Sequence, residues 1–193
     1  MPVSTIPEPN TPQQIKITVI WVVEEIDQPA VSRMAAAWWK YLPQDVRFVI
    51  ILKTQDPYIN NFIGTHLYRG IPRCIVVNVP ESTTIKQCFR IGENLAHKNS
   101  NIYITFFNEV ILDKEALIKA IQVLAKDEKN EICVFKEAIG PSGVPEQVPF
   151  EMNNFYISKW GLSTIQPGQH IYVALAEPKH ITVGSKRTDQ LTV

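Results

Sequence analysis

The sequence predicts one α/β domain with a mostly parallel sheet flanked by helices and with antiparallel strands added near the C-terminus. From residue 15 to residue 135, apolar runs of strand length alternate with segments of helical spacing, as in parallel sheets with right-handed crossovers. The length of 193 residues, of which 45% are hydrophobic and 20% charged, fits a single domain with one core. After residue 136 short apolar runs alternate with loops, which favours antiparallel or edge strands.

The strands are predicted by apolar runs rich in β-branched and aromatic residues. Five such runs lie in the first part of the chain, at residues 15–23, 46–52, 74–79, 102–107 and 132–135. A loop rich in proline and glycine follows at residues 140–149, and shorter runs come after it, at residues 155–157, 171–176 and 181–183. These shorter runs are the predicted antiparallel or edge strands.

Two helices are predicted in the connections between the first three strands, each by apolar residues at helical spacing. The first begins at Pro29 and stops at Pro43. The second has a predicted N-cap at Asp56, which is followed by Pro57, a residue favoured at the first helical position. It is expected to end near Gly70, because glycine is common just after a helix.

Two further helices are predicted before and after the strand at residues 102–107. Ser82 or Thr83 is expected to cap the first, whose inner face consists of Ile85, Cys88, Phe89 and Gly92, with Leu95 or Ala96. Asp113 is expected to cap the second, which has Leu117, Ile121 and Leu124 on its inner side.

The chain divides into an extended arm, one domain and a tail. Residues 1–14 contain four prolines, residues 15–183 carry the α/β pattern, and residues 184–193 are mostly polar. Free termini are usually disordered unless something ties them down. The hypothesis here is that both tails are tied down by docking on neighbouring protein subunits.

Charge and composition exclude several classes of partner. Lysine plus arginine equals aspartate plus glutamate, at 19 each, which gives no electrostatic reason to expect nucleic acid. No apolar stretch approaches the roughly 20 residues of a membrane span, and the N-terminal arm does not resemble a signal peptide. The three cysteines, Cys74, Cys88 and Cys133, lie in separate apolar runs. They are expected to be buried thiols, which fits the cytoplasm or a soluble assembly.

A resemblance to a known family is carried by residues 84–124. They read FRIGENLA at 89–96, IYITFFNEVIL at 102–112 and DKEAL at 113–117. In order and spacing these resemble the R-N-x-G-x-x-x-A helix, the Y-I-x-F-L-D-D-D strand and the following helix of family 2 glycosyltransferases, which have the GT-A fold. The turn at residues 54–56 and the segment at 151–162 also look like family segments, so the resemblance covers about residues 15–165.

The resemblance implies transfer of a sugar from a nucleotide-diphosphate donor to an acceptor hydroxyl, with inversion. In the family, a D-x-D motif holds Mn²⁺ or Mg²⁺ against the diphosphate of the sugar nucleotide, because a hard cation offsets the leaving group's charge. By position, the candidate metal ligands are Asn108 and Glu109. The candidate donor-binding residues are Glu24, Asp56 and Arg90, and the candidate catalytic bases are Glu137 and Glu151.

Three positions depart from the family pattern. The D-x-D motif aligns with Phe107-Asn108-Glu109, so the first acid is replaced by phenylalanine. The base-binding aspartate at the end of the second strand aligns with residue 51, 52 or 53, which are isoleucine, leucine and lysine. The first strand exits into Glu24 and Glu25, and two carboxylates would repel a diphosphate.

Each candidate also has a structural interpretation. Glu24 and Glu25 are then a solvated strand exit, Glu109 a capping or surface residue, and Arg90 an exposed arginine. Fold does not decide function, so three hypotheses stay open: a GT-A-like domain that has lost catalysis and acts as a binding or structural subunit, an active sugar transferase, or another nucleotide-dependent enzyme such as a nucleotidyltransferase. The three joint replacements favour the first, which needs no cofactor.

Overall fold

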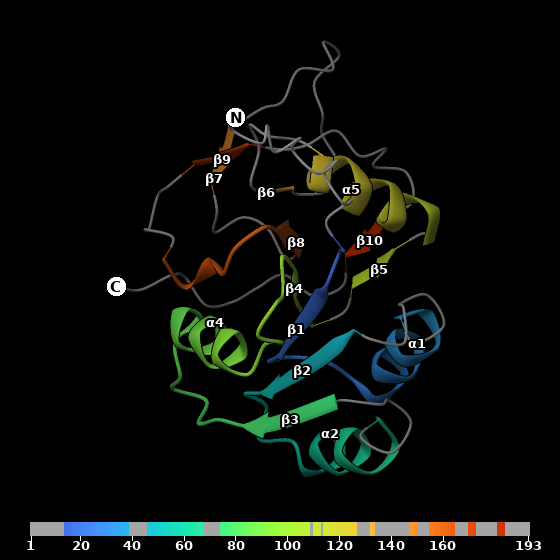
Figure 1. Cartoon of the computed structure of the whole chain (residues 1–193). Coiled ribbons are helices and arrows are strands. Elements are labelled where there is room, and N and C mark those ends of the chain that lie inside the picture. The colour runs from blue at the N-terminus through green and yellow to red at the C-terminus, as the bar shows by residue number, and fades with distance from the viewer. Residues whose placement is uncertain are drawn as a thin grey trace, which may run out of the picture.

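The structure is a computed structural model. It describes residues 14–38, 46–67, 74–108, 110–112, 114–126, 132–133, 147–149, 155–164, 170–172 and 181–183. Figure 1 shows a central sheet with helices on both of its faces.

The central sheet has six strands in the order β3-β2-β1-β4-β8-β6. Their bounds are β1 Ile17–Val23, β2 Arg47–Leu52, β3 Cys74–Asn78, β4 Ile102–Phe107, β6 Ile132–Cys133 and β8 Phe155–Ser158. β1 pairs in parallel with β2 and β4, and β2 pairs in parallel with β3. The predicted α/β class with a mostly parallel sheet is therefore confirmed.

The antiparallel strand β8 lies inside the sheet. It pairs with β4 on one side and with β6 on the other, and both pairings are antiparallel. β6 therefore runs in the same direction as β4 but is separated from it by a strand that comes later in the chain. The predicted strand at 155–157 is confirmed as antiparallel, in an interior position.

Two small antiparallel sheets complete the fold. β5 (Val110–Leu112) pairs with β10 (Ile181–Val183), and β7 (Gln147–Pro149) pairs with β9 (His170–Tyr172). The strands expected within 171–176 and at 181–183 are confirmed by β9 and β10. The prediction of a loop through 140–149 is wrong at its end, because β7 pairs with a segment more than 20 residues later, which no local pattern reveals.

Helices cover both faces of the central sheet. α1 (Gln28–Trp38), α2 (Pro57–Phe62) with the following π-helical turn η1 (Ile63–Leu67), and α5 (Lys114–Lys126) pack on one face. α4 (Ile85–Asn94) and the 3₁₀ turn η3 (Leu162–Thr164) pack on the other. Figure 1 shows α4 and α1 on opposite sides of the sheet. Among the described helices, none is long and apolar enough to cross a membrane.

Two helix starts can be compared with the sequence. Asp56 caps α2 as predicted, with its side chain accepting from the backbone N–H of Tyr58 at 2.8 Å. The cap predicted for α4 is wrong, because Thr84 caps it in place of Ser82 or Thr83. Thr84 and Gln87 form a reciprocal capping box, which satisfies two backbone donors. Asp113 and residues 39–45 lie outside the described residues.

The core extends on both sides of β1, which is buried along its whole length. Val19, Trp21 and Val23 face α1, α2 and α5, whereas Ile20 and Val22 face α4. Such continuous apolar strands are expected where a parallel sheet is covered on both faces. Cys74 and Cys88 are buried, as predicted, and burial raises the pKa of the Cys74 thiol to about 12. The side chain of Cys133 is outside the described set.

Candidate functional site

The strand order places a topological switch point between β1 and β4. From β1 the chain builds outward through β2 and β3, then returns across β1 to form β4 on its other side. In open α/β sheets, ligands bind outside the carboxyl ends of the strands at such a point. The residues after β1, β2 and β4 are therefore the candidate site: Glu24 and Glu25, Lys53 to Asp56, and Asn108.

Asn108 joins the exits of β4 and β1. Its side-chain oxygen Oδ1 accepts hydrogen bonds from the backbone N–H groups of Glu24 and Glu25, each at 2.8 Å. Its own backbone N–H donates to Val22 at 2.9 Å, and its carbonyl accepts from Trp21 Nε1 at 2.8 Å. The residue is 1% exposed. To bind a metal through its side chain, Asn108 would need Oδ1, which already accepts hydrogen bonds from the amides of Glu24 and Glu25.

Glu24 and Lys53 form a buried ion pair between the exits of β1 and β2. Lys53 Nζ lies 2.7 Å from Glu24 Oε1, and the side chains are 3% and 6% exposed. The backbone N–H groups of Lys53 and Thr54 both donate to the carbonyl of Val23, so the two exits are also joined through the main chain. The solvated interpretation of Glu24 is therefore wrong, because Lys53 holds it out of water, whereas Glu25 is exposed.

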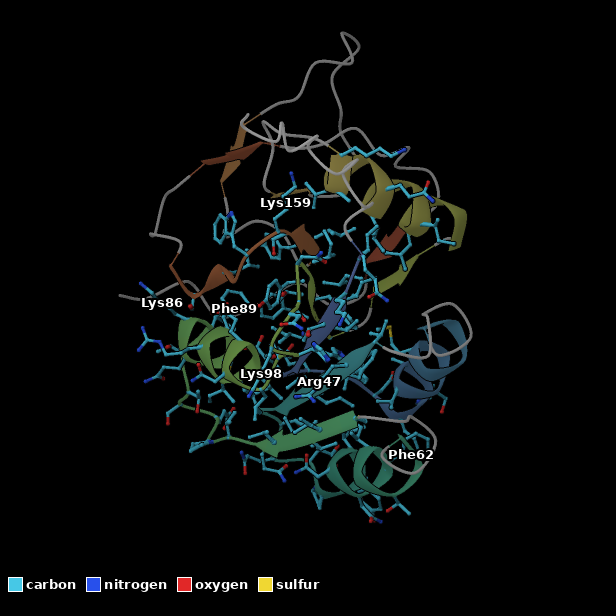
Figure 2. The ribbon with its side chains drawn as sticks, viewed as in Figure 1. Arg47, Phe62, Lys86, Phe89, Lys98 and Lys159 are labelled. Atoms are coloured by element: carbon cyan, nitrogen blue, oxygen red, sulfur yellow. The ribbon has the colours of Figure 1, made fainter. Side chains whose placement is uncertain are left out.

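Phe107, the last residue of β4, belongs to the core. It is fully buried on the α4 face. Its ring meets that of Phe89 on α4 edge to face, with the centroids 5.6 Å apart, and Figure 2 shows Phe89 on this helix. The side chain at this position therefore packs between sheet and helix.

The remaining candidates from the sequence either have another role in the structure or lie outside the described residues. Asp56 uses its carboxylate to cap α2. Arg90 is exposed in the middle of α4, and no hydrogen bond or ion pair joins it to another described residue. Glu109, Glu137 and Glu151 lie outside the described residues, so their predicted roles are untested. Over the part of the chain that the structure describes, no three His, Cys, Asp or Glu side chains gather as a metal site would require.

A second polar cluster on the α4 face was not predicted from the sequence. Glu93 accepts hydrogen bonds from the backbone N–H of Ser163, at 2.9 Å, and from its hydroxyl, which ties α4 to η3. Burial, and then the charge of Glu93, raise the pKa of Tyr103 on β4. No local signal reveals this cluster, because Glu93 and Ser163 are 70 residues apart.

Comparison with known proteins identifies the fold. No protein-family model matches the sequence, and no curated protein matches it. Among solved structures, the mannosyltransferase PcManGT from Pyrobaculum calidifontis, in complex with GDP-Man and Mn²⁺, matches with a TM-score of 0.57 and 12% identity over 77% of this chain and 46% of its own. S. aureus TarS 1-349 matches with a TM-score of 0.55 and 12% identity, over 75% of this chain and 47% of its own. The chain has a GT-A-like fold.

The GT-A-like domain is also similar to a synthase. The 4-diphosphocytidyl-2C-methyl-D-erythritol synthase from Anaerococcus prevotii DSM 20548 matches with a TM-score of 0.52 and 12% identity, over 75% of this chain and 70% of its own. The GT-A-like chain spans about half the length of PcManGT and TarS 1-349. At such identities the likeness establishes the fold, and function has to be argued from the site.

Proposed function

We propose that this GT-A-like domain has lost sugar transfer and acts as a binding or structural subunit of a larger assembly. The observation that carries the proposal is the internal pairing at the switch point. Glu24 is bound to Lys53, and the Asn108 oxygen is bound to the amides of Glu24 and Glu25. A diphosphate leaving group needs a cation held by free oxygen ligands, and these side chains already have partners inside the domain.

The position aligned with the first acid of the D-x-D motif supports the same proposal. Phe107 fills that position and packs against Phe89. An aspartate placed there would be surrounded by the apolar α4 face, where burying a charge is costly unless it is paired. We infer that the motif is degenerate, with Glu109 as its one remaining carboxylate, and that the domain needs no metal cofactor.

Titration calorimetry of the full chain tests the loss of donor binding. UDP, GDP, CDP and their sugar conjugates would be titrated with and without Mn²⁺. We expect no metal-dependent heat of binding. Metal-dependent binding that disappears in Glu109→Ala would revive the active, inverting transferase, and Thr84→Ala would serve as a control at a capping residue outside the candidate site.

The subunit role has a separate test. The two tails are proposed to contact neighbouring protein subunits, so the full chain should self-associate or join a larger assembly. Analytical ultracentrifugation would compare the full chain with a variant lacking residues 1–14 and 184–193. Association that depends on the tails supports the proposal, whereas a monomer at all concentrations that also fails to join any purified assembly would refute the structural role.

A further inference from the structure

Two consecutive backbone amides at the switch point converge on one oxygen. The N–H groups of Glu24 and Glu25 both point at Asn108 Oδ1, at 2.8 Å each. Successive amides arranged in this way form a nest, a concavity that binds an acceptor oxygen. The nest lies where open α/β sheets bind their ligands, yet a side chain of the same domain fills it.

The conformation of Asn108 is unusual for a residue that only joins two strands. Its φ is 51°, and it is the one non-glycine residue with positive φ in the described ranges. Asparagine adopts this left-handed conformation more readily than most residues, but the conformation is still disfavoured. The backbone bonds to Val22 and Trp21 hold it there.

The fit of the Asn108 side chain to its surroundings is incomplete. Its amide nitrogen Nδ2 is buried and has no hydrogen-bond partner among the described residues, although buried polar groups are nearly always bonded. An asparagine selected only to join β1 to β4 would be expected to satisfy both ends of its amide. The amide oxygen is bonded by the nest, whereas the nitrogen is left without a partner in the part of the chain that the structure describes.

We propose that Asn108 is an intramolecular plug in a binding site for the carbonyl oxygen of a small neutral ligand, such as a carboxamide. Glu25 flanks the nest, and the positive charge of Lys53 is already paired with Glu24. A ligand that brings a further negative charge is therefore disfavoured there. A neutral carbonyl accepts from both amides without that repulsion. The inference rests on the proposed function in one respect. It names Asn108 as the group that fills the carboxyl edge of the sheet, where a sugar-nucleotide donor would bind.

Removing the plug and supplying its chemical equivalent tests the proposal. Asn108→Gly tolerates the positive φ and deletes the carboxamide, and acetamide is the group deleted. Thermal unfolding and amide NMR spectra would be recorded over a series of acetamide concentrations. We expect acetamide to raise the Tm of Asn108→Gly saturably and to shift the Glu24 and Glu25 amide resonances, with acetate acting more weakly and the wild type unaffected.

The controls separate specific binding from general solvent effects. Asn108→Asp keeps an oxygen in the nest and should not respond to acetamide. Thr84→Ala removes a helix cap elsewhere and should not respond either. An equal response of all variants, or unchanged Glu24 and Glu25 resonances in Asn108→Gly, would overturn the proposal.

A measurement on the wild type covers the case in which Asn108→Gly does not fold. Hydrogen exchange of the Glu24 and Glu25 amides should be slow, because the plug bonds both. Exchange as fast as that of freely exposed amides would contradict the plug. Metal-dependent binding of a sugar nucleotide by the wild type would refute the proposed function and leave the acetamide result unchanged, so the two failures are distinguishable.

Discussion

The ammonium group of Lys53 lies 2.7 Å from a carboxylate oxygen of Glu24, and the pair joins the carboxyl ends of β2 and β1. Both side chains are almost fully buried. Removing one member of a buried pair leaves an uncompensated charge, at a cost of about 3–5 kcal/mol, whereas replacing both with apolar groups is often neutral or stabilising.

Lys53→Met is therefore expected to lower the free energy of unfolding by about 3 kcal/mol. The double variant Lys53→Met/Glu24→Leu should recover most of that loss. Urea unfolding measures both, with Lys126→Met as a control at an exposed lysine. A Lys53→Met loss no larger than the roughly 0.5 kcal/mol of an ordinary surface substitution would show that the pair is not buried in solution.

Gly92 permits the close packing of α4 on β1. A Cβ at this position would lie 2.6 Å from Ile20 Cγ2, which is a buried core atom. Overpacking of this kind costs about 1–3 kcal/mol, so Gly92→Ala should be destabilising by that amount. Gly64→Ala is the matched control, because a Cβ there meets no atom of the described residues within 4 Å. Thermal or urea unfolding would contradict this packing if the two variants were equally stable.

Burial makes the Cys74 thiol unreactive. Its pKa is raised from 9.0 to about 12, and the thiolate is the reactive form. The folded state therefore holds the proton more tightly than the unfolded state. The stability from this group is complete below pH 9 and is lost as the pH rises from about 9 toward 12.

Alkylation with iodoacetamide, followed by peptide mass spectrometry, tests this at pH 8. Cys74 should stay unmodified in the folded protein and react fully in urea. Rapid labelling of the folded protein at this peptide would mean that β3 opens or that the thiol is exposed.

The sequence patterns predicted the helices and strands better than they predicted which strands lie side by side. The runs that became β1, β2 and β4 could be recognised because these strands are almost wholly buried and therefore mostly apolar. The edge strand β3 is only partly buried, and it could be recognised by its β-branched residues. The interior position of β8 could not, because its pairing with β4 joins residues about 50 positions apart. The Thr84 cap was misassigned by one or two residues, since neighbouring hydroxyl residues give the same local signal.

The candidate site was only partly visible in the sequence. Asn108 and Glu24 were candidates because of their places at strand ends, and Lys53 was one of three residues that could align with the base-binding aspartate. Their partners could not be predicted, because Lys53 lies 29 residues from Glu24 and Asn108 lies 84 residues from it. Those contacts exist only once β2 and β4 pair with β1.

The charge of Glu93 should be detectable through Tyr103. Burial is the larger cause of the raised Tyr103 pKa, and Glu93 is the second. Glu93→Gln is expected to lower the pKa of Tyr103 only part of the way to its ordinary value. NMR titration of the labelled tyrosine ring measures this shift, and Glu81→Gln, at an exposed acid before α4, is the control. An unchanged Tyr103 pKa in Glu93→Gln would place the two groups too far apart to interact.

The central claim is that the switch point of this GT-A-like domain no longer holds a metal-bound diphosphate. Paramagnetic broadening tests it most directly, since Mn²⁺ broadens the resonances of nearby amides. With GDP and Mn²⁺ added to the labelled full chain, we predict that the amides of Glu24, Glu25 and Asn108 broaden no more than exposed amides elsewhere. Selective broadening of these three amides, reversed by a chelator, would contradict the account.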